Sequence, residues 1–206
     1  MRALWIRLIL TLPMFSGCAV PTTYGMLTDG LQPLEGQANV TPFGGASAGV
    51  EQAGGGGLSV ETPPVGRTSF AFIGGYASHE SHPLAGLGME SRYRIARDAD
   101  APAQGMFMSG LGYSQYPHED ISQLGVHGGV LGSYRVGPLR PYLGAKFNVA
   151  ANGWLGIWGM GTAGLSVSPV KDRRSLSLAG EVSVIEGSNE DGRAAVLPMG
   201  YFRLPL

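Results

Sequence analysis

Short segments in which apolar and polar residues alternate recur along most of this chain, and they constrain its fold more than any other feature. In residues 141–149, one set of alternate positions holds Leu143, Ala145, Phe147 and Val149, and the other holds Tyr142, Gly144, Lys146 and Asn148. Successive side chains of an extended strand point to opposite faces, so a strand separates the two sets. Residues 87–95 and 175–184 repeat the pattern, and no segment shows helical apolar spacing with caps. The sequence therefore predicts an all-β fold.

The composition indicates where the apolar face of these strands lies. Charged residues make up only 14% of the chain, against about 25% in ordinary soluble proteins, and 34 of its 206 residues are glycine. A barrel whose outer face contacts lipid needs few charges and accommodates glycine where its wall closes on bulky neighbours. The net charge of −1 gives no attraction to nucleic acid, which we exclude as a partner.

We expect ten strands, most of them near the ~9–11 residues that cross a bilayer at a tilt. Their ranges are 38–50, 55–61, 67–77, 86–97, 104–114, 122–136, 139–150, 155–168, 173–185 and 194–204. The connections alternate between short, proline-rich ones (62–66, 98–103, 137–138 and 169–172) and longer polar ones (79–85, 115–121 and 186–193). This alternation is typical of tight periplasmic turns and longer outer loops. It predicts an antiparallel up-and-down transmembrane β-barrel over residues 38–206, with eight strands as the alternative if 38–61 form a tether or plug.

One hairpin carries a family resemblance. The stretch Gly137-Pro-Leu-Arg-Pro-Tyr-Leu-Gly-Ala145 resembles the turn-to-strand junctions of small outer-membrane β-barrel proteins. The chain departs from that family at its end, which is Tyr201-Phe-Arg-Leu-Pro-Leu206 rather than a terminal phenylalanine. Pro198 within the last strand also removes a ladder hydrogen bond, so both features weigh against closure of the barrel through this strand.

The first eighteen residues have the layout of a signal peptide. Two arginines precede an apolar run that Pro13 interrupts, and the run is too short for a spanning helix, which needs ~20 residues. The end of this segment, Phe15-Ser-Gly-Cys18, resembles a bacterial lipobox, which implies acylation of Cys18, the only cysteine. The alternative is an ordinary signal peptide cut after Ala19. The residues after Cys18 lack the aspartate that retains lipoproteins in the inner membrane, so the resemblance points to the bacterial outer membrane. Residues 19–37 are expected to be a tether.

Charged residues on the polar faces are the first candidate site. Inside a barrel they would meet in a narrow lumen, where buried charges are tolerated when paired. The predicted lumen network consists of Glu90, Arg92, Arg94, His127, Arg135, Lys146 and Glu181. We favour a salt-bridged interior that fills the barrel over a gate or small pore, because a wall of eight to ten strands leaves little space.

Histidines in two predicted outer loops are a weaker candidate. His79 and His82 lie in one loop, and His118 precedes two acidic residues in the next loop on the same side, so the three are weak candidates for zinc ligands. Neither stretch has the helical spacing of a hydrolytic zinc site, and no catalytic motif or cofactor fingerprint is present. We therefore expect no metal, no cofactor and no enzymatic activity.

These observations favour a non-enzymatic outer-membrane (lipo)protein of a Gram-negative envelope. Its expected role is structural or within a surface assembly, with membrane lipid and other envelope proteins as partners. Two alternatives stay open. One is an enzyme at the barrel rim that hydrolyses envelope lipid or peptide, and the other is a periplasmic binder of an apolar ligand in the manner of a lipocalin.

Overall fold

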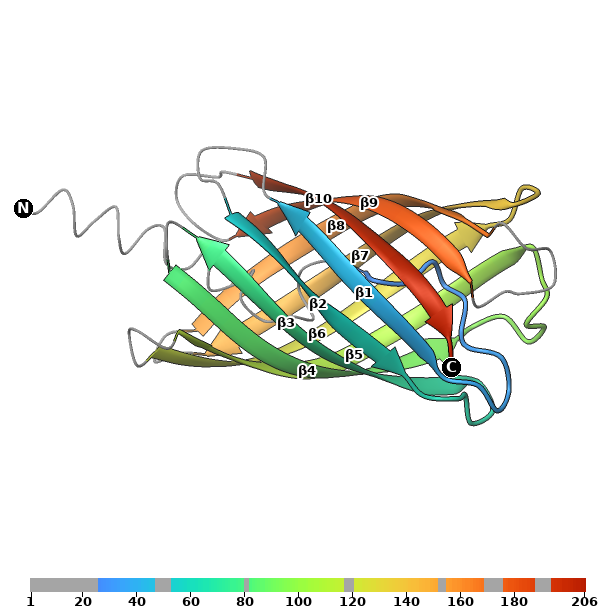
Figure 1. Ribbon diagram of the computed structural model, residues 1–206, viewed down its shortest axis with the longest axis horizontal. Helices are drawn as coiled ribbons and strands as arrows, with labels where there is room; N and C mark the ends of the chain where they lie inside the picture. Colours follow the sequence, from blue (N-terminus) through green and yellow to red (C-terminus); the bar gives the residue numbers. More distant parts are fainter. Residues whose placement is uncertain are drawn as a thin grey trace, which may run out of the picture.

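The computed structural model describes residues 26–46, 53–79, 82–116, 121–151, 155–168, 176–187 and 194–206. They form a closed barrel in which each strand pairs antiparallel with its neighbours in the chain (Figure 1). The strands are β1 (Asn39–Ala46), β2 (Ala53–Glu61), β3 (Thr68–His79), β4 (His82–Arg94), β5 (Ala103–Tyr116), β6 (Ile121–Tyr134), β7 (Leu139–Ala151), β8 (Leu155–Val167), β9 (Ser177–Gly187) and β10 (Ala194–Pro205). The predicted ten-stranded up-and-down barrel is confirmed, and the eight-stranded alternative is wrong because β1 and β2 both belong to the wall.

β10 closes the barrel even though its proline weighed against closure. It pairs with β1 from Asn39↔Pro205 to Gly45↔Met199, and with β9 on its other side. Pro198 lies one residue beyond the last pair between β1 and β10, so its missing N–H interrupts none of the residue pairs of that seam.

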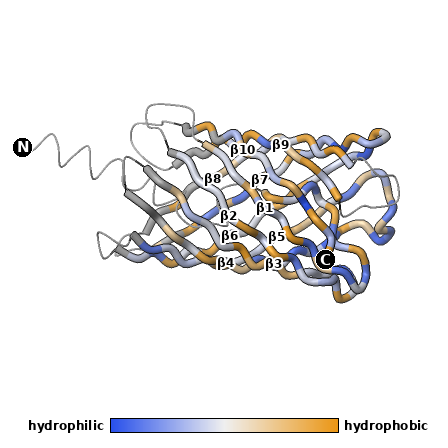
Figure 2. Tube along the Cα trace, in the orientation of Figure 1, coloured by the Kyte–Doolittle hydropathy of each residue, from blue (hydrophilic) through white to orange (hydrophobic). Residues whose placement is uncertain are grey.

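The two faces of the wall differ as the alternation predicted. Large apolar side chains such as Leu143 (68% exposed), Phe147 (55%) and Leu178 (58%) point outward, while Lys146 and Glu181 are buried inside. Figure 2 shows hydrophobic residues distributed along the strands, with hydrophilic stretches at the end of the barrel where the chain finishes. The exterior is therefore apolar and the interior polar, as in a barrel whose outer face contacts lipid. Among the described residues, there is no helix with the length and apolar character required to cross a membrane.

One end of the barrel, here called the turn end, holds the start of β1, the end of β10 and four connections, including β2–β3 and β6–β7. The β6–β7 connection is a tight turn in which Val136 and Leu139 exchange backbone hydrogen bonds. Gly137 takes a φ of 62° at its first central position, which a type II′ turn reserves for glycine.

The opposite end, the loop end, differs from expectation in the length of its connections. β3 continues to His79 and β4 starts at His82, so most of the predicted loop 79–85 is strand. His79 and His82 are themselves register partners, because the ladder between β3 and β4 extends to the last residue before the connection. Between β5 and β6 the strands likewise extend to Tyr116 and from Ile121.

Candidate functional site

The lumen contains a stretch of the chain that precedes β1. Residues 26–33, here called the plug segment, are buried, with Met26, Thr28 and Asp29 each 0% exposed. In Figure 1 the coil before β1 folds back into the turn end of the barrel. The sequence predicted a tether over residues 19–37, and the structure differs for this part of it. Two prolines and low periodicity argue against a strand or helix, but they do not distinguish a free linker from an irregular segment that fills a cavity.

Three residues of the plug segment, Met26, Asp29 and Gln32, make polar contacts with the wall. The backbone N–H of Met26 donates to Glu181 Oε1 at 2.9 Å. Asp29 pairs with Arg203 of β10 at 2.9 Å and accepts a hydrogen bond from Ser166 Oγ of β8 at 2.6 Å. These charge-assisted contacts satisfy groups that would be costly to bury alone. The plug segment is thus bound to the barrel rather than merely enclosed by it.

Gln32 makes the contacts nearest the turn end. Its side-chain Nε2 donates to the backbone oxygens of Arg67 at 2.8 Å and Arg92 at 2.9 Å, and to Ser69 Oγ at 3.3 Å. Three acceptors around one amide nitrogen determine how the side chain is turned. Gln32 therefore links the plug segment to β4, to β3 and to the residue that directly precedes β3.

Gly30 lets the plug segment lie against β6. Its φ is 84°, and a Cβ at this position would lie 2.7 Å from Leu131 Cδ2 and 3.0 Å from Ser133 Oγ. Both the left-handed backbone and the close approach require glycine. This residue therefore determines how closely the plug segment can pack on the wall.

A network of charges centred on Glu90 occupies the lumen. Glu90 Oε2 accepts hydrogen bonds from Lys146 Nζ at 2.8 Å and contacts His127 Nε2 at 2.9 Å, and Glu90 Oε1 contacts Arg92 Nε at 2.7 Å. Arg92 also donates from Nη1 to Glu61 Oε2 at 2.8 Å. All five side chains are at least nine-tenths buried. The cations are thereby matched by carboxylates inside the wall, and the network fills space that an open channel would need.

The other residues of the predicted network lie elsewhere. Arg135 is exposed because β6 ends at Tyr134, so its side chain is beyond the wall at the turn end. Arg94, the last residue of β4, is half-buried and lines a pocket at that end. Glu181 is buried on β9. It accepts a hydrogen bond from the Tyr142 hydroxyl at 2.9 Å and holds the plug segment instead.

Sequence reasoning missed several lumen residues. Glu61 and Arg203 occupy inward positions of β2 and β10, and continuing the alternation from Ser59 and Tyr201 would have found them. Asp29 gave no such signal, because it precedes the first strand and has no periodicity.

Several sequence-based candidates fall at or beyond the limits of the described residues. Cys18 and His118 lie outside them, and His79 and His82 are backbone register partners at the last pair of the β3–β4 ladder. Within the part of the chain that the structure describes, no group of three histidine, cysteine, aspartate or glutamate residues could hold a metal ion.

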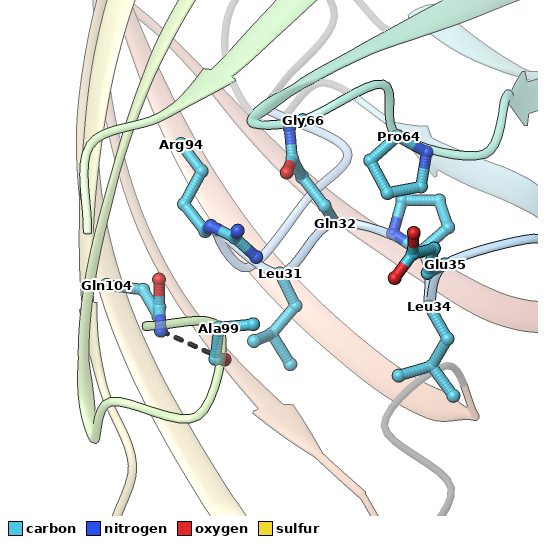
Figure 3. Close-up of a pocket in the computed structure, with 11 residues that line it drawn as sticks. Leu31, Gln32, Leu34, Glu35, Pro64, Gly66, Arg94, Ala99 and Gln104 are labelled. Atoms are coloured by element: carbon cyan, nitrogen blue, oxygen red, sulfur yellow. Dashed lines mark hydrogen bonds between the residues drawn. The ribbon is translucent and has the colours of Figure 1, made fainter. Parts of the chain in front are cut away.

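A pocket of about 280 Å³ opens at the turn end, between the plug segment and two turns. We call it the mouth pocket, and Figure 3 shows the residues that line it. They are Gly30, Leu31, Gln32, Pro33, Leu34, Glu35, Pro64, Gly66, Arg94, Ala99 and Gln104. Its lining combines apolar side chains with the charged side chains of Glu35 and Arg94.

Comparisons with solved structures bear on the fold. The β domain of the Bordetella autotransporter Brka has a TM-score of 0.54 to this chain at 8% identity, covering 82% of this chain and 98% of that domain. A bacterial polysaccharide outer-membrane secretin has a TM-score of 0.51 at 9% identity, covering 84% of this chain and 67% of that one. No family model matches the sequence, and no curated protein matches it.

The fold is that of a bacterial outer-membrane β-barrel. The closed antiparallel wall is shared with these structures, and the exposed apolar side chains around it suit an outer-membrane location. At such low identity, the likeness concerns architecture and does not extend to secretion or translocation.

Proposed function

We propose that this protein is a non-enzymatic outer-membrane barrel with a structural role, closed to solutes by its own plug segment. The observation that carries the proposal is the ion pair between Asp29 and Arg203, which fixes the plug segment inside the lumen. The Glu90 network closes a further part of the cross-section with paired charges. A barrel filled in this way supports a structural or surface-assembly role better than the passage of solutes.

The distribution of polarity argues against the lipocalin-like alternative. A barrel that binds an apolar ligand in water needs an apolar interior and a polar exterior. Here Leu143 and Leu178 are exposed on the outside, while Glu90, Arg92 and Lys146 are buried within. This arrangement favours a lipid environment over an enclosed apolar ligand.

The position of His127 does not favour the alternative of a hydrolase at the rim. Its Nε2 contacts a carboxylate oxygen that also accepts a hydrogen bond from Lys146, and its side chain lies inside the wall. A general base must reach the proton that it abstracts from substrate or nucleophile. His127 is occupied by a structural partner in the lumen instead.

Conductance measurements on the full-length protein in planar lipid bilayers test the proposal. We expect no stable ion channel from the wild type. We expect openings from a variant lacking residues 26–33, because that deletion removes the plug segment and leaves Arg203 and Glu181 facing water. A wild type that conducts steadily contradicts a closed structural barrel. A silent deletion variant that still folds would show that the plug segment is not what closes it.

We also propose that Cys18 carries the lipid anchor of the mature chain. The proposal rests on the lipobox-like sequence, and dual acylation gives stable membrane attachment where one chain gives only reversible binding. Membrane lipid would then be the first partner of the protein, with other envelope proteins as further candidates. Intact mass of the mature protein tests this, because a chain that starts at Val20 without added lipid contradicts it.

A further inference from the structure

We propose that the outer face of the barrel binds the headgroup of an anionic phospholipid at the turn end. The residues that carry the proposal are Arg67, Tyr93, Ile95 and Arg97, here called the rim patch, which lie where β3 begins and β4 ends. β3 and β4 are neighbours in the wall (Figure 1). The inference goes beyond the structural role proposed above, and it holds whether or not the plug segment closes the barrel.

The alternation of β4 places the apolar part of the rim patch on the lipid side of the wall. Tyr93 is 37% exposed and Ile95 is 45% exposed, whereas Arg92, between two outward positions, is buried in the lumen. Successive side chains of a strand point to opposite faces. Tyr93 and Ile95 therefore face outward at the last turns of the wall before the rim.

Arg67 is held on the same outer side by two contacts. Its Cζ atom lies 5.0 Å from the centre of the Tyr93 ring, and its Nη1 donates to the backbone oxygen of Ile95 at 3.3 Å. A guanidinium stacked on an aromatic ring keeps its charge, and the N–H groups at its edge can still bind an anion. Tyr93 thus positions a cation over the outer face instead of in the lumen.

The charge of the rim patch is not neutralised by the part of the chain that the structure describes. Arg97 is exposed two residues after Ile95, and neither Arg67 nor Arg97 forms an ion pair with another described residue. The acid next to Arg97 is Asp98, whose Oδ1 accepts the backbone N–H of Asp100 at 2.8 Å and so caps its own turn. Two cations therefore lie at the rim beside an aromatic ring, and an anionic group complements them.

The surroundings of the rim patch favour a lipid over a soluble anion. Phe107 of β5 is the register partner of Tyr93, and it is 52% exposed on the outer face. Phe70 of β3 is 41% exposed and lies further from the rim than Arg67. Aromatic side chains at the ends of membrane-spanning segments lie at the level of the headgroups. A phosphate at the two arginines would therefore have its acyl chains against the apolar wall.

The charge of the rim patch also selects among phospholipids. A guanidinium binds a phosphate through parallel, charge-assisted hydrogen bonds. Phosphatidylethanolamine carries an ammonium group beside its phosphate, and two arginines repel that cation. Phosphatidylglycerol has the phosphate without the cation, so it is the class of lipid that we assign to the site.

Native mass spectrometry of the full-length protein in a neutral detergent tests the proposal. The protein is titrated with phosphatidylglycerol and with phosphatidylethanolamine that has the same acyl chains. We expect saturable binding of phosphatidylglycerol, with a Kd at least about fivefold lower than that of phosphatidylethanolamine. Arg67→Gln should raise the Kd for phosphatidylglycerol by about fivefold, because it removes one arginine from the site. Glycerol phosphate, which has the phosphate without the chains, should not compete at the same concentration.

Arg135→Gln is the matched control, since it removes an exposed arginine from the same end of the barrel. Arg135 follows β6, two strands away from β4, so this variant should bind phosphatidylglycerol like the wild type. Arg97→Gln is the second test variant if Arg67→Gln does not fold, because the exposed Arg97 side chain forms no hydrogen bond with the described residues. It should also weaken binding.

Three results would overturn the proposal. The first is equal affinity for the two phospholipids, which would show that the arginines do not select charge. The second is equal weakening by Arg67→Gln and Arg135→Gln, which would indicate a general attraction to the turn end. The third is competition by glycerol phosphate as strong as that by the lipid, which would assign the site to soluble anions instead.

Discussion

Asp29 in the plug segment and Arg203 in β10 form a buried ion pair, with Oδ1 and Nη2 2.9 Å apart. β10 is also the strand that closes the barrel against β1, from Asn39↔Pro205 onward. One contact therefore joins the filling of the lumen to the closing of the wall. Because Arg203 and Asp29 are 1% and 0% exposed, neither charge can be solvated if the other is lost.

Removal of Asp29 should destabilise the folded barrel strongly. Asp29→Ala leaves the Arg203 guanidinium buried without its carboxylate, and breaking a buried pair in this way costs about 3–5 kcal/mol. The free energy of unfolding in denaturant, measured in detergent micelles, gives the change. Glu35→Ala, an exposed acid just beyond the plug segment, should change stability by less than about 0.5 kcal/mol.

The double variant Asp29→Leu with Arg203→Met distinguishes the cost of an unpaired buried charge from the cost of the cavity that a smaller side chain leaves. It should recover a large part of the stability, because two apolar side chains replace the pair without leaving a charge. A double variant as unstable as Asp29→Ala would mean that the other contacts of Asp29, with Ser166 above all, dominate instead.

Gly164 of β8 should tolerate no side chain. It is the register partner of Tyr142 of β7, and a Cβ at Gly164 would collide with the Tyr142 ring, which crosses to Glu181. Gly164→Ala should lower the free energy of unfolding by about 1–3 kcal/mol, the usual cost of overpacking. Gly161→Ala on the same strand meets nothing within 4 Å and is the control. Equal stability of the two variants would show that Tyr142 can move aside without cost.

The alternation of apolar and polar residues was sufficient to predict the strands. Ten ranges, the antiparallel order and the inward positions of Glu90, Arg92, His127 and Lys146 all follow from a period of two, because a strand has no other way to separate its faces. Strand ends were less predictable. Arg135 occupies a position that would point inward if β6 continued. The strand ends at Tyr134, however, so the Arg135 side chain is exposed.

The plug segment could not be predicted, because its contacts are set by the three-dimensional cavity. Met26, Asp29 and Gln32 are held by residues of β4, β8, β9 and β10 that are distant in sequence. Irregular backbone also leaves no periodic trace, and the left-handed φ of 52° at Leu27 is stabilised only by its surroundings. The same holds for the mouth pocket, whose lining comes from three separate segments.

An arginine on the outer face should be more harmful in the middle of a strand than at its end. Leu143 and Leu139 both point outward from β7, but Leu139 is the first residue of the strand at the turn end. Leu143→Arg should cost roughly 2–4 kcal/mol of folding free energy in lipid, and Leu139→Arg about 0–1 kcal/mol, because the cost falls toward the interface. Refolding titrations into lipid vesicles measure both. Equal costs would contradict a lipid-facing exterior at this part of the wall.

The turn end should face the periplasm, and the loop end should face the cell exterior. The connections β3–β4 and β5–β6 lie at one end of the barrel and β4–β5 lies at the other, since consecutive strands are antiparallel. Epitope tags inserted at Ser81 and Glu119, which lie outside the described residues, should therefore label on intact cells, while a tag at Asp100 should label only after permeabilisation. Proline-rich, tight turns favour the periplasmic side. Each tagged protein must first show the gel migration of the folded barrel when unheated, so that a hidden tag is not mistaken for a misfolded one. Labelling of Asp100 alone would invert this topology, and labelling of all three sites on intact cells would contradict a barrel that crosses the membrane.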